Sequence, residues 1–164
     1  MTDAKAFRQA WGMFVTGVSV ITTIEPDGQV HGMTANGIAS VSLDPLLVLI
    51  CVGHNTNSYP LIKRSRRFAI SILNEDQQRV GEFYARPPEQ RTGDVGVSFS
   101  LTEQGSAIVD DCLASMDCHV VDEHVAGDHT IFIGEVDEIQ VNSGKPLVFF
   151  EGKFGRLGAN GFQS

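Results

Sequence analysis

The chain of 164 residues has room for one domain, and its 42% hydrophobic and 20% charged residues are ordinary for a globular protein. Its formal net charge of −8 argues against nucleic acid or an anionic membrane as the main partner, because both favour a basic surface. The N-terminus lacks the basic start and apolar run of a signal peptide, and no segment approaches the roughly 18 apolar residues that span a bilayer, so we expect a cytoplasmic protein.

Strand-forming segments dominate the chain. The first helix is expected to begin after Thr2 or Asp3, either of which can cap it, and to end near Gly17. Further helices are expected at residues 59–64 and from about 74 to 84. Strands are expected at residues 18–24, 29–33, 46–52, 68–73, 113–125, 130–141, 147–150 and 153–154.

These strands follow one another through turns instead of alternating with helices. The pattern therefore predicts a mainly β fold, a barrel with peripheral helices. The nearly continuous apolar run at 46–52 is typical of a strand buried on both faces. Residues 34–40 are a stretch of small and polar residues, and the loop at 86–96 is long enough to be mobile or functional. We expect a single domain over 1–164, with 158–164 as a frayed tail.

Familiar catalytic and metal-binding signatures do not occur in the sequence. There is no GxGxxG after a strand, no P-loop and no GxSxG elbow. No CxxC pair occurs among the three cysteines, which we expect to be reduced packing residues: Cys51, Cys112 and Cys118. Three histidines lie five residues apart, a spacing that alternates strand faces and matches no zinc pattern, so no metal site is predicted at His119, His124 and His129.

Three polar clusters are candidate ligand sites. Small residues between Thr34 and Ser42 allow a ligand to approach the backbone. Thr56-Asn57-Ser58 follows a buried strand and precedes a helix, so it fits either a phosphate site or a simple N-cap. Gly127-Asp128-His129 lies at a hairpin and fits either a ligand site or no site at all, in which case the aspartate is a turn residue and the histidine a surface imidazole. Unaided, these clusters support only a phosphate-bearing ligand in a small barrel.

An ordered set of short motifs covers nearly the whole chain, and the order and spacing are more specific than any single motif. The motifs are Phe14-Val15-Thr16-Gly17-Val18, Gly32-Met33-Thr34-Ala35-Asn36, Ser40-Val41-Ser42-Leu43-Asp44-Pro45, Leu49-Ile50-Cys51-Val52, Asn57-Ser58-Tyr59-Pro60, Phe68-Ala69-Ile70-Ser71-Ile72-Leu73 and the segment 126–136. In these motifs the chain resembles the short-chain flavin reductases of the FMN-binding split-barrel group, which supply reduced flavin to two-component monooxygenases.

The resemblance implies a Greek-key split β-barrel of the FMN-binding type that forms a homodimer, with flavin near the dimer interface. It implies that the isoalloxazine edge of the flavin contacts Thr34, Ala35 and Asn36, and that the same wall continues through Ser40, Val41 and Ser42. It also implies that main-chain atoms of Cys51 and Val52 lie beside the ribityl chain, and that the phosphate is bound by Thr56, Asn57 and Ser58. It places His129 near the nicotinamide, Phe83 at the pocket edge, and Arg86 and Arg91 as phosphate or pyrophosphate candidates.

The reaction implied is reduction of FMN or FAD by NADH or NADPH, with direct hydride transfer to flavin N5 and a partner monooxygenase that uses the product. Because the cofactors carry this chemistry, His129 is expected to position the nicotinamide and not to act as a base. Few cations are expected near the phosphate, which predicts loosely bound flavin that leaves as a substrate. The alternative is a flavin- or haem-binding split-barrel module without nicotinamide turnover, since fold does not fix function.

Overall fold

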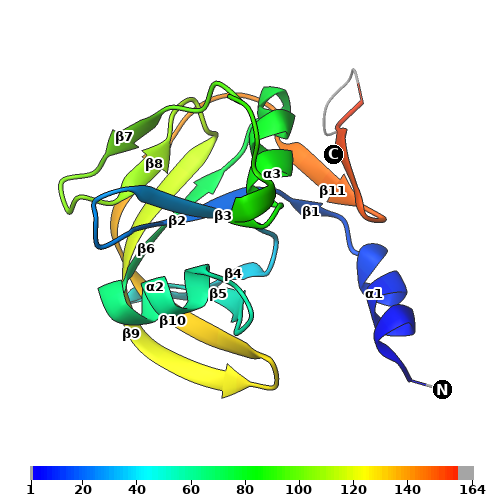
Figure 1. Cartoon of the computed structure of the whole chain (residues 1–164), viewed down its shortest axis with the longest axis horizontal. Coiled ribbons are helices and arrows are strands. Elements are labelled where there is room, and N and C mark those ends of the chain that lie inside the picture. Colours follow the sequence, from blue (N-terminus) through cyan, green and yellow to red (C-terminus); the bar gives the residue numbers. More distant parts are fainter. Residues whose placement is uncertain (1, 159–164) are drawn as a thin grey trace.

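A computed structural model describes residues 2–158, and its largest element is an antiparallel sheet of seven strands (Figure 1). The strands of this sheet are β2 (Ser19–Ile24), β3 (Val30–Ala35), β4 (Ile38–Leu43), β5 (Leu46–Gly53), β6 (Arg67–Ile72), β9 (Ala114–Ala126) and β10 (His129–Val141). Their order across the sheet is β3-β2-β6-β9-β10-β5-β4. The prediction of a mainly β fold is confirmed.

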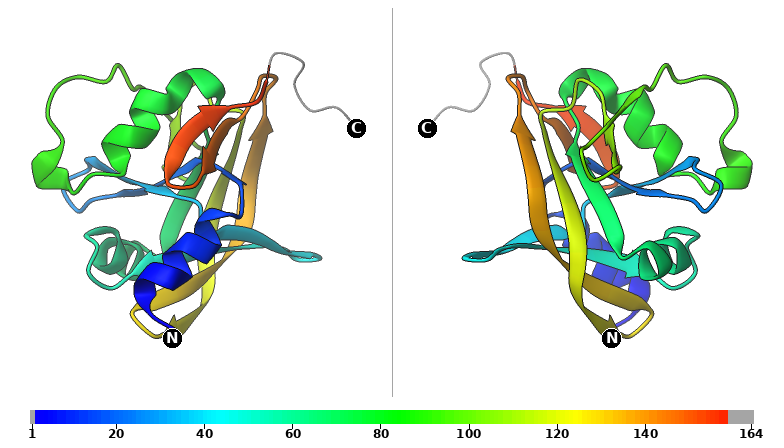
Figure 2. Two further views of the ribbon diagram at one scale, coloured as in Figure 1. Left: turned by 90° about the vertical axis from the view of Figure 1, so that its right-hand side faces the viewer. Right: turned by 90° about the vertical axis from the view of Figure 1, so that its left-hand side faces the viewer.

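Smaller elements surround the sheet. One small sheet contains β1 (Thr16–Gly17), β11 (Leu147–Phe150) and β12 (Lys153–Arg156). A second small sheet contains β7 (Phe99–Leu101) and β8 (Ala107–Val109). The helices are α1 (Ala4–Gly12), α2 (Ser58–Ser65) and α3 (Gln78–Tyr84), with short 3-10 turns η1 (Glu75–Gln77) and η2 (Pro88–Gln90). Helix α1 projects from the body of the molecule, whereas α2 and α3 lie against it (Figures 1 and 2).

The two edges of the main sheet are consecutive in sequence. Strands β3 and β4 are its first and last strands, yet only Asn36 and Gly37 connect them. Three backbone steps span at most about 11 Å, so the edges must approach each other at this end. The sheet is therefore curled into a barrel, and its edges are not paired with each other in the described strands (Figure 2). We call this unpaired meeting of β3 and β4 the seam.

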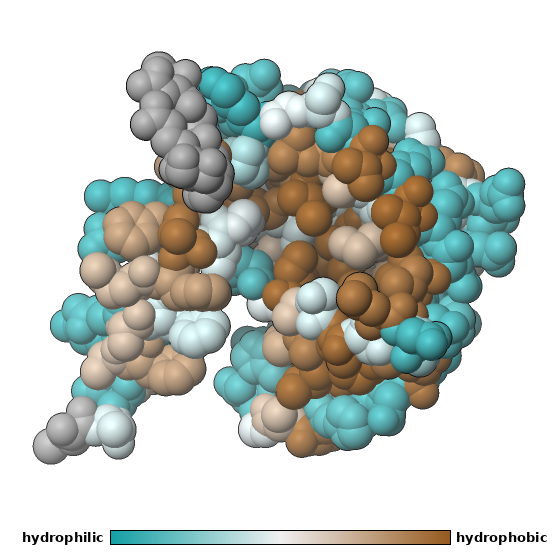
Figure 3. All heavy atoms as spheres, turned by 180° about the vertical axis from the view of Figure 1, so that it is seen from behind, coloured by the Kyte–Doolittle hydropathy of each residue, from teal (hydrophilic) through white to brown (hydrophobic). Residues whose placement is uncertain are grey.

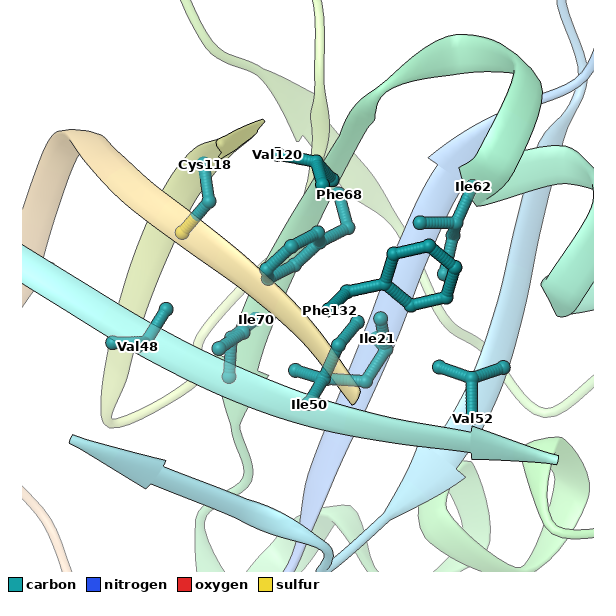
Figure 4. Close-up of a cluster of buried hydrophobic side chains, with 10 residues drawn as sticks. All are labelled: Ile21, Val48, Ile50, Val52, Ile62, Phe68, Ile70, Cys118, Val120 and Phe132. Atoms are coloured by element: carbon teal, nitrogen blue, oxygen red, sulfur yellow. The ribbon is translucent and has the colours of Figure 1, made fainter. Parts of the chain in front are cut away.

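The interior of the curled sheet holds the main hydrophobic core (Figure 4). Its buried members are Ile21, Val48, Ile50, Val52, Ile62, Phe68, Ile70, Cys118, Val120 and Phe132. Strand β5 contributes only alternate side chains, because successive residues of a strand point to opposite faces. The expectation that residues 46–52 are buried on both faces is therefore wrong. Strands β2 and β6 instead have consecutive buried residues.

Several element boundaries differ from the sequence-based expectations. The first helix ends at Gly12, not near Gly17, and Asp3 caps it by accepting a hydrogen bond from the Ala6 N–H (2.7 Å). The polar stretch 34–40 enters strand β4, and the hairpin of β7 and β8 was not expected. The Asn74 side chain caps η1, so the helical segment starts where it was predicted. Most of the predicted frayed tail, residues 159–164, lies outside the described residues.

Within residues 2–158, no helix is both long and apolar enough to cross a membrane. The same residues bring together no group of three or more histidine, cysteine or acidic side chains that could hold a metal ion. The three histidines spaced five apart each face a separate carboxylate, the pairs being His119–Asp137 (2.9 Å), His124–Asp122 (3.1 Å) and His129–Asp128 (2.7 Å).

Candidate functional site

A cavity of about 390 Å³ opens between strand β3, the start of α2 and the loop after α3. We call it the polar cavity. Its walls come from His31, Met33, Thr34, Asn55, Thr56, Asn57, Ser58, Tyr84, Ala85, Arg86, Pro87, Pro88, Glu89 and Arg91. Six of these are predicted ligand residues, so the fold brings together segments that are far apart in sequence.

The turn between β5 and α2 forms one wall of the polar cavity. Thr56 folds this turn back, because both its N–H (3.1 Å) and its hydroxyl (2.8 Å) donate to the Gly53 carbonyl. Helix α2 then begins at Ser58, and the Asn57 side chain makes no capping hydrogen bond in the described structure. The first N–H groups of a helix have no intrahelical acceptor and carry a partial positive charge. The wall is therefore suited to an anion. The Asn57 side chain does not cap helix α2, so an N-cap role does not account for this residue.

Arg91 forms the opposite wall and is held rigidly. Its Nε donates to the Arg86 carbonyl (2.9 Å), and its Nη2 donates to the Tyr84 carbonyl (3.4 Å). The guanidinium lies 5.0 Å from the centre of the Tyr84 ring. Burial lowers the pKa of Arg91, but a guanidinium stays charged in proteins. With Arg86 also in the wall, two cations line the cavity.

A second cavity of about 350 Å³ adjoins the polar cavity, because Thr34 and Ala85 line both. We call it the apolar cavity, since its remaining walls are mostly apolar: Val18, Ala35, Asn36, Phe149, Gly152 and Phe154. Strand β11 brings Phe149 here by pairing with β1, and its ring meets that of Phe154 edge to face at 5.2 Å. The walls can accept a planar aromatic ring.

The segment Thr34-Ala35-Asn36 joins the two cavities and is fixed in place by hydrogen bonds. The Thr34 hydroxyl donates to the Gly81 carbonyl of α3 (2.6 Å), and the Ala35 carbonyl accepts from the Ser19 hydroxyl (2.7 Å). The Asn36 amide donates to the Thr16 hydroxyl (3.3 Å). These contacts hold the end of strand β3 as a preformed wall.

Several predicted ligand residues lie outside both cavities in the described structure. Three of them, Ser40, Val41 and Ser42, lie on edge strand β4, at an irregularity in its pairing with β5. The Val52 side chain is fully buried in the core, which leaves only main-chain atoms for a ligand. Cys51 is half-buried, and its burial raises the pKa of the thiol. Phe83 lines a separate small cavity of about 180 Å³ that also contains Arg86.

His129 lies beside the turn that forms the polar cavity. It is the first residue of β10 and pairs with Gly53, and a Cβ placed on Gly53 would be 3.4 Å from His129 Nε2 and 3.0 Å from Asn55 Oδ1. The imidazole is 48% exposed, so it is accessible to a ligand. Its hydrogen bond to Asp128 lowers the pKa of that carboxyl, and this contact orients the ring.

Sequence reasoning missed some of the residues that line the cavities. His31 lies just before Gly32-Met33-Thr34, and strand alternation places its side chain on the same side as Met33, so a signal was present. Phe149 and Phe154 carried no such signal, since only the tertiary pairing of β1 with β11 brings them to the site.

Comparisons with known proteins show the family to which the chain is similar. The model of the flavin reductase like domain matches residues 11–158. Over 155 residues the chain is 38% identical to the FMN reductase (NADH) SmoA of Agrobacterium fabrum, covering 94% of this chain and 87% of that protein. It is 34% identical over 155 residues to the reductase component of a 4-nitrophenol 4-monooxygenase/4-nitrocatechol 2-monooxygenase of Rhodococcus opacus, covering 94% and 82%.

The fold is shared with a solved structure of the same kind. The flavin reductase PheA2 in its native state superposes with a TM-score of 0.88 at 44% identity, covering 96% of this chain and 99% of that one. The curled sheet with its open seam is the split barrel of these proteins. By sequence over most of its length and by fold, the chain belongs to the flavin reductase family.

Proposed function

We propose that this protein uses NADH to reduce FMN or FAD, and that a partner monooxygenase consumes the reduced flavin. The observation that carries the proposal is the pair of adjoining cavities, which share Thr34 and Ala85. The polar cavity has two arginines and a helix N-terminus for a phosphate, and the apolar cavity has aromatic walls for a ring. Relatives described as an NADH-dependent FMN reductase and as a monooxygenase reductase component support the donor and the partner.

In this proposal the residues of the chain bind the flavin and orient it. Flavin, when bound, supplies an N5 atom that accepts hydride directly from a nicotinamide. Thr56, Asn57, Ser58 and Arg91 hold the phosphate end, while the fixed wall at Thr34 sets where the ring lies. Accurate placement is the main contribution that a protein makes to such a transfer, since reacting atoms must approach within about 3–3.5 Å.

A steady-state assay tests the proposed reaction. Purified protein is mixed with NADH or NADPH, and loss of the reduced-nicotinamide absorbance is followed with FMN, FAD, riboflavin or no added flavin. We expect rapid oxidation of NADH only when flavin is present. If neither nicotinamide is oxidised in a flavin-dependent way, the protein is a flavin- or haem-binding module instead.

The His129→Ala variant is expected to raise the KM for NADH about fivefold while kcat changes less than about twofold, since one hydrogen bond contributes about 1 kcal/mol to binding. The reason is that His129 is an exposed, carboxylate-oriented imidazole beside the cavity, suited to positioning a ligand. His124→Ala is the matched control, because His124 is an exposed histidine on the same hairpin that also faces an aspartate. A collapse of kcat with unchanged KM would make His129 a participant in the chemistry.

The protein is further proposed to form a homodimer, because a large apolar surface lies uncovered. Figure 3 shows hydrophobic side chains gathered over one face, with the arm of α1 standing apart from it. No residue of α1 is buried in the described structure, and Phe7, Trp11 and Phe14 are each at least 60% exposed. Leu43 and Leu46, at the tip of the β4–β5 hairpin, are also exposed. Such patches normally mark an interface, so sedimentation equilibrium is expected to give twice the mass of the chain.

A further inference from the structure

A buried histidine connects the polar cavity to a surface carboxylate. His31 is 6% exposed and lies on strand β3 between two polar partners. Its Nε2 is 2.9 Å from the Ser58 hydroxyl, and its Nδ1 is 3.2 Å from the Glu25 carboxylate. Ser58 is only 2% exposed and begins helix α2. His31 and Ser58 both line the polar cavity, so a carboxylate–imidazole–hydroxyl chain ends at the wall assigned to phosphate.

The protonation state of His31 sets the direction of the Ser58 hydroxyl. An ionised carboxylate only accepts hydrogen bonds, so Nδ1 carries the proton that faces Glu25. In the neutral imidazole Nε2 must then accept, and the Ser58 O–H donates to it. In that state the serine hydrogen is already donated to His31, and the serine oxygen offers only lone pairs to the cavity. A phosphate dianion also offers only lone pairs, so the neutral state opposes its binding.

Protonation of the imidazole reverses this hydrogen bond. Both ring nitrogens then donate, and Ser58 Oγ accepts from Nε2–H. The serine hydrogen becomes free to donate to a phosphate oxygen. We propose that His31 is a positioning residue that takes up a proton when the flavin phosphate binds, and so turns the Ser58 hydroxyl toward that phosphate. This inference rests on the proposed function, which places the phosphate beside Ser58.

The charges around His31 fit a proton that arrives with the ligand. Glu25 faces the ring from the turn between β2 and β3, and Arg91 faces it from the loop after η2. Burial lowers the pKa of His31, Arg91 lowers it further, and Glu25 raises it. Arg86 and Glu89 line the same cavity. Because the net direction is downward, the free protein holds the neutral ring near neutral pH, and a bound dianion supplies the charge that favours the imidazolium.

Calorimetry measures directly how many protons the complex takes up when a flavin binds. FMN and riboflavin are titrated into the protein in several buffers of different ionisation enthalpy at about pH 7.5, where the phosphate is mostly dianionic. We expect FMN to bind with an uptake of up to about one proton more than riboflavin, which lacks the phosphate. His31→Gln is expected to abolish this difference, because a glutamine amide can donate to Ser58 without titrating.

A second variant replaces a partly exposed side chain instead of a buried one. Glu25 has a 37% exposed side chain, so Glu25→Gln leaves packing intact while removing the charge that favours the imidazolium. The pH at which FMN-linked uptake is half complete should fall, and Asp27→Asn in the same turn, where Asp27 contacts Gln29, should leave it unchanged. A FMN-linked uptake that persists unaltered in both His31→Gln and Glu25→Gln would overturn the inference.

The experiment also separates this inference from the proposed function. If FMN and riboflavin bind equally tightly to the unaltered protein, then the phosphate does not lie in the polar cavity and the proposed site fails. If FMN binds more tightly than riboflavin but without linked proton uptake, then the site stands and only the role of His31 is refuted.

Discussion

Replacing Arg91 by alanine is expected to raise the Kd of FMN about 10- to 100-fold, since hydrogen bonds to charged groups contribute about 1.5–3 kcal/mol. The Kd of riboflavin should change less than about threefold, because riboflavin lacks the phosphate. The guanidinium is fixed by two backbone carbonyls and the Tyr84 ring, so it needs little ordering when a ligand arrives. Titration by flavin fluorescence quenching measures both constants.

Two further variants test how Arg91 acts. Arg64→Ala removes the same charge from an exposed position in the last turn of α2, and should leave the Kd of FMN nearly unchanged. Arg91→Lys keeps the charge but loses the planar fork that reaches both carbonyls, so an intermediate Kd is expected. If Arg91→Ala weakens FMN and riboflavin equally, then Arg91 shapes the loop and does not recognise phosphate.

Gly134→Ala is expected to lower the free energy of unfolding by about 3 kcal/mol, the upper end of the usual cost of overpacking a core. A Cβ at Gly134 would lie 2.6 Å from Phe68 Cζ and 3.0 Å from Cys118 Cβ. Phe68 and Cys118 are both fully buried, so neither has free space into which it can move. Urea denaturation followed by far-ultraviolet circular dichroism gives the free energy.

The control for this substitution is Gly155→Ala in strand β12. A Cβ there would meet nothing within 4 Å among the described residues, so stability should stay within about 0.5 kcal/mol of the unaltered protein. Folded Gly134→Ala should also keep the unaltered ratio of FMN to riboflavin affinity, because Gly134 lines neither cavity in the described structure. A stability loss below about 0.5 kcal/mol in Gly134→Ala would mean that the core around Phe68 can relax.

Local signals predicted much of the fold correctly. The long strands β9 and β10 were predicted to within a residue or two, because the Gly127-Asp128 turn and the β-branched runs beside it are neighbours in sequence. Strand β4 was missed because its small polar residues resemble a loop. The burial of β5 was misread because an apolar run does not reveal which of its two faces the rest of the chain covers.

The site was predicted less completely than the fold. Motif resemblance identified Thr34 and the turn at 56–58, both of which line the polar cavity. Tyr84 was not predicted, because its place depends on contact with Gly32, where a Cβ would lie 2.8 Å from the Tyr84 ring. That close approach lets Tyr84 hold Arg91. Contacts of this kind between distant segments leave no periodic trace in a sequence.

The seam between β3 and β4 bears on how such a protein can diversify. Within the described residues, neither strand contributes a member to the three buried clusters of the core, although Met33, Ala35 and Ile38 pack against the main one. Asn36, which is exposed and lines the apolar cavity, therefore lies where replacement costs the scaffold little. Selection for a new flavin or nicotinamide preference and selection for stability can then act on separate residues, which makes the seam the natural place for specificity to evolve.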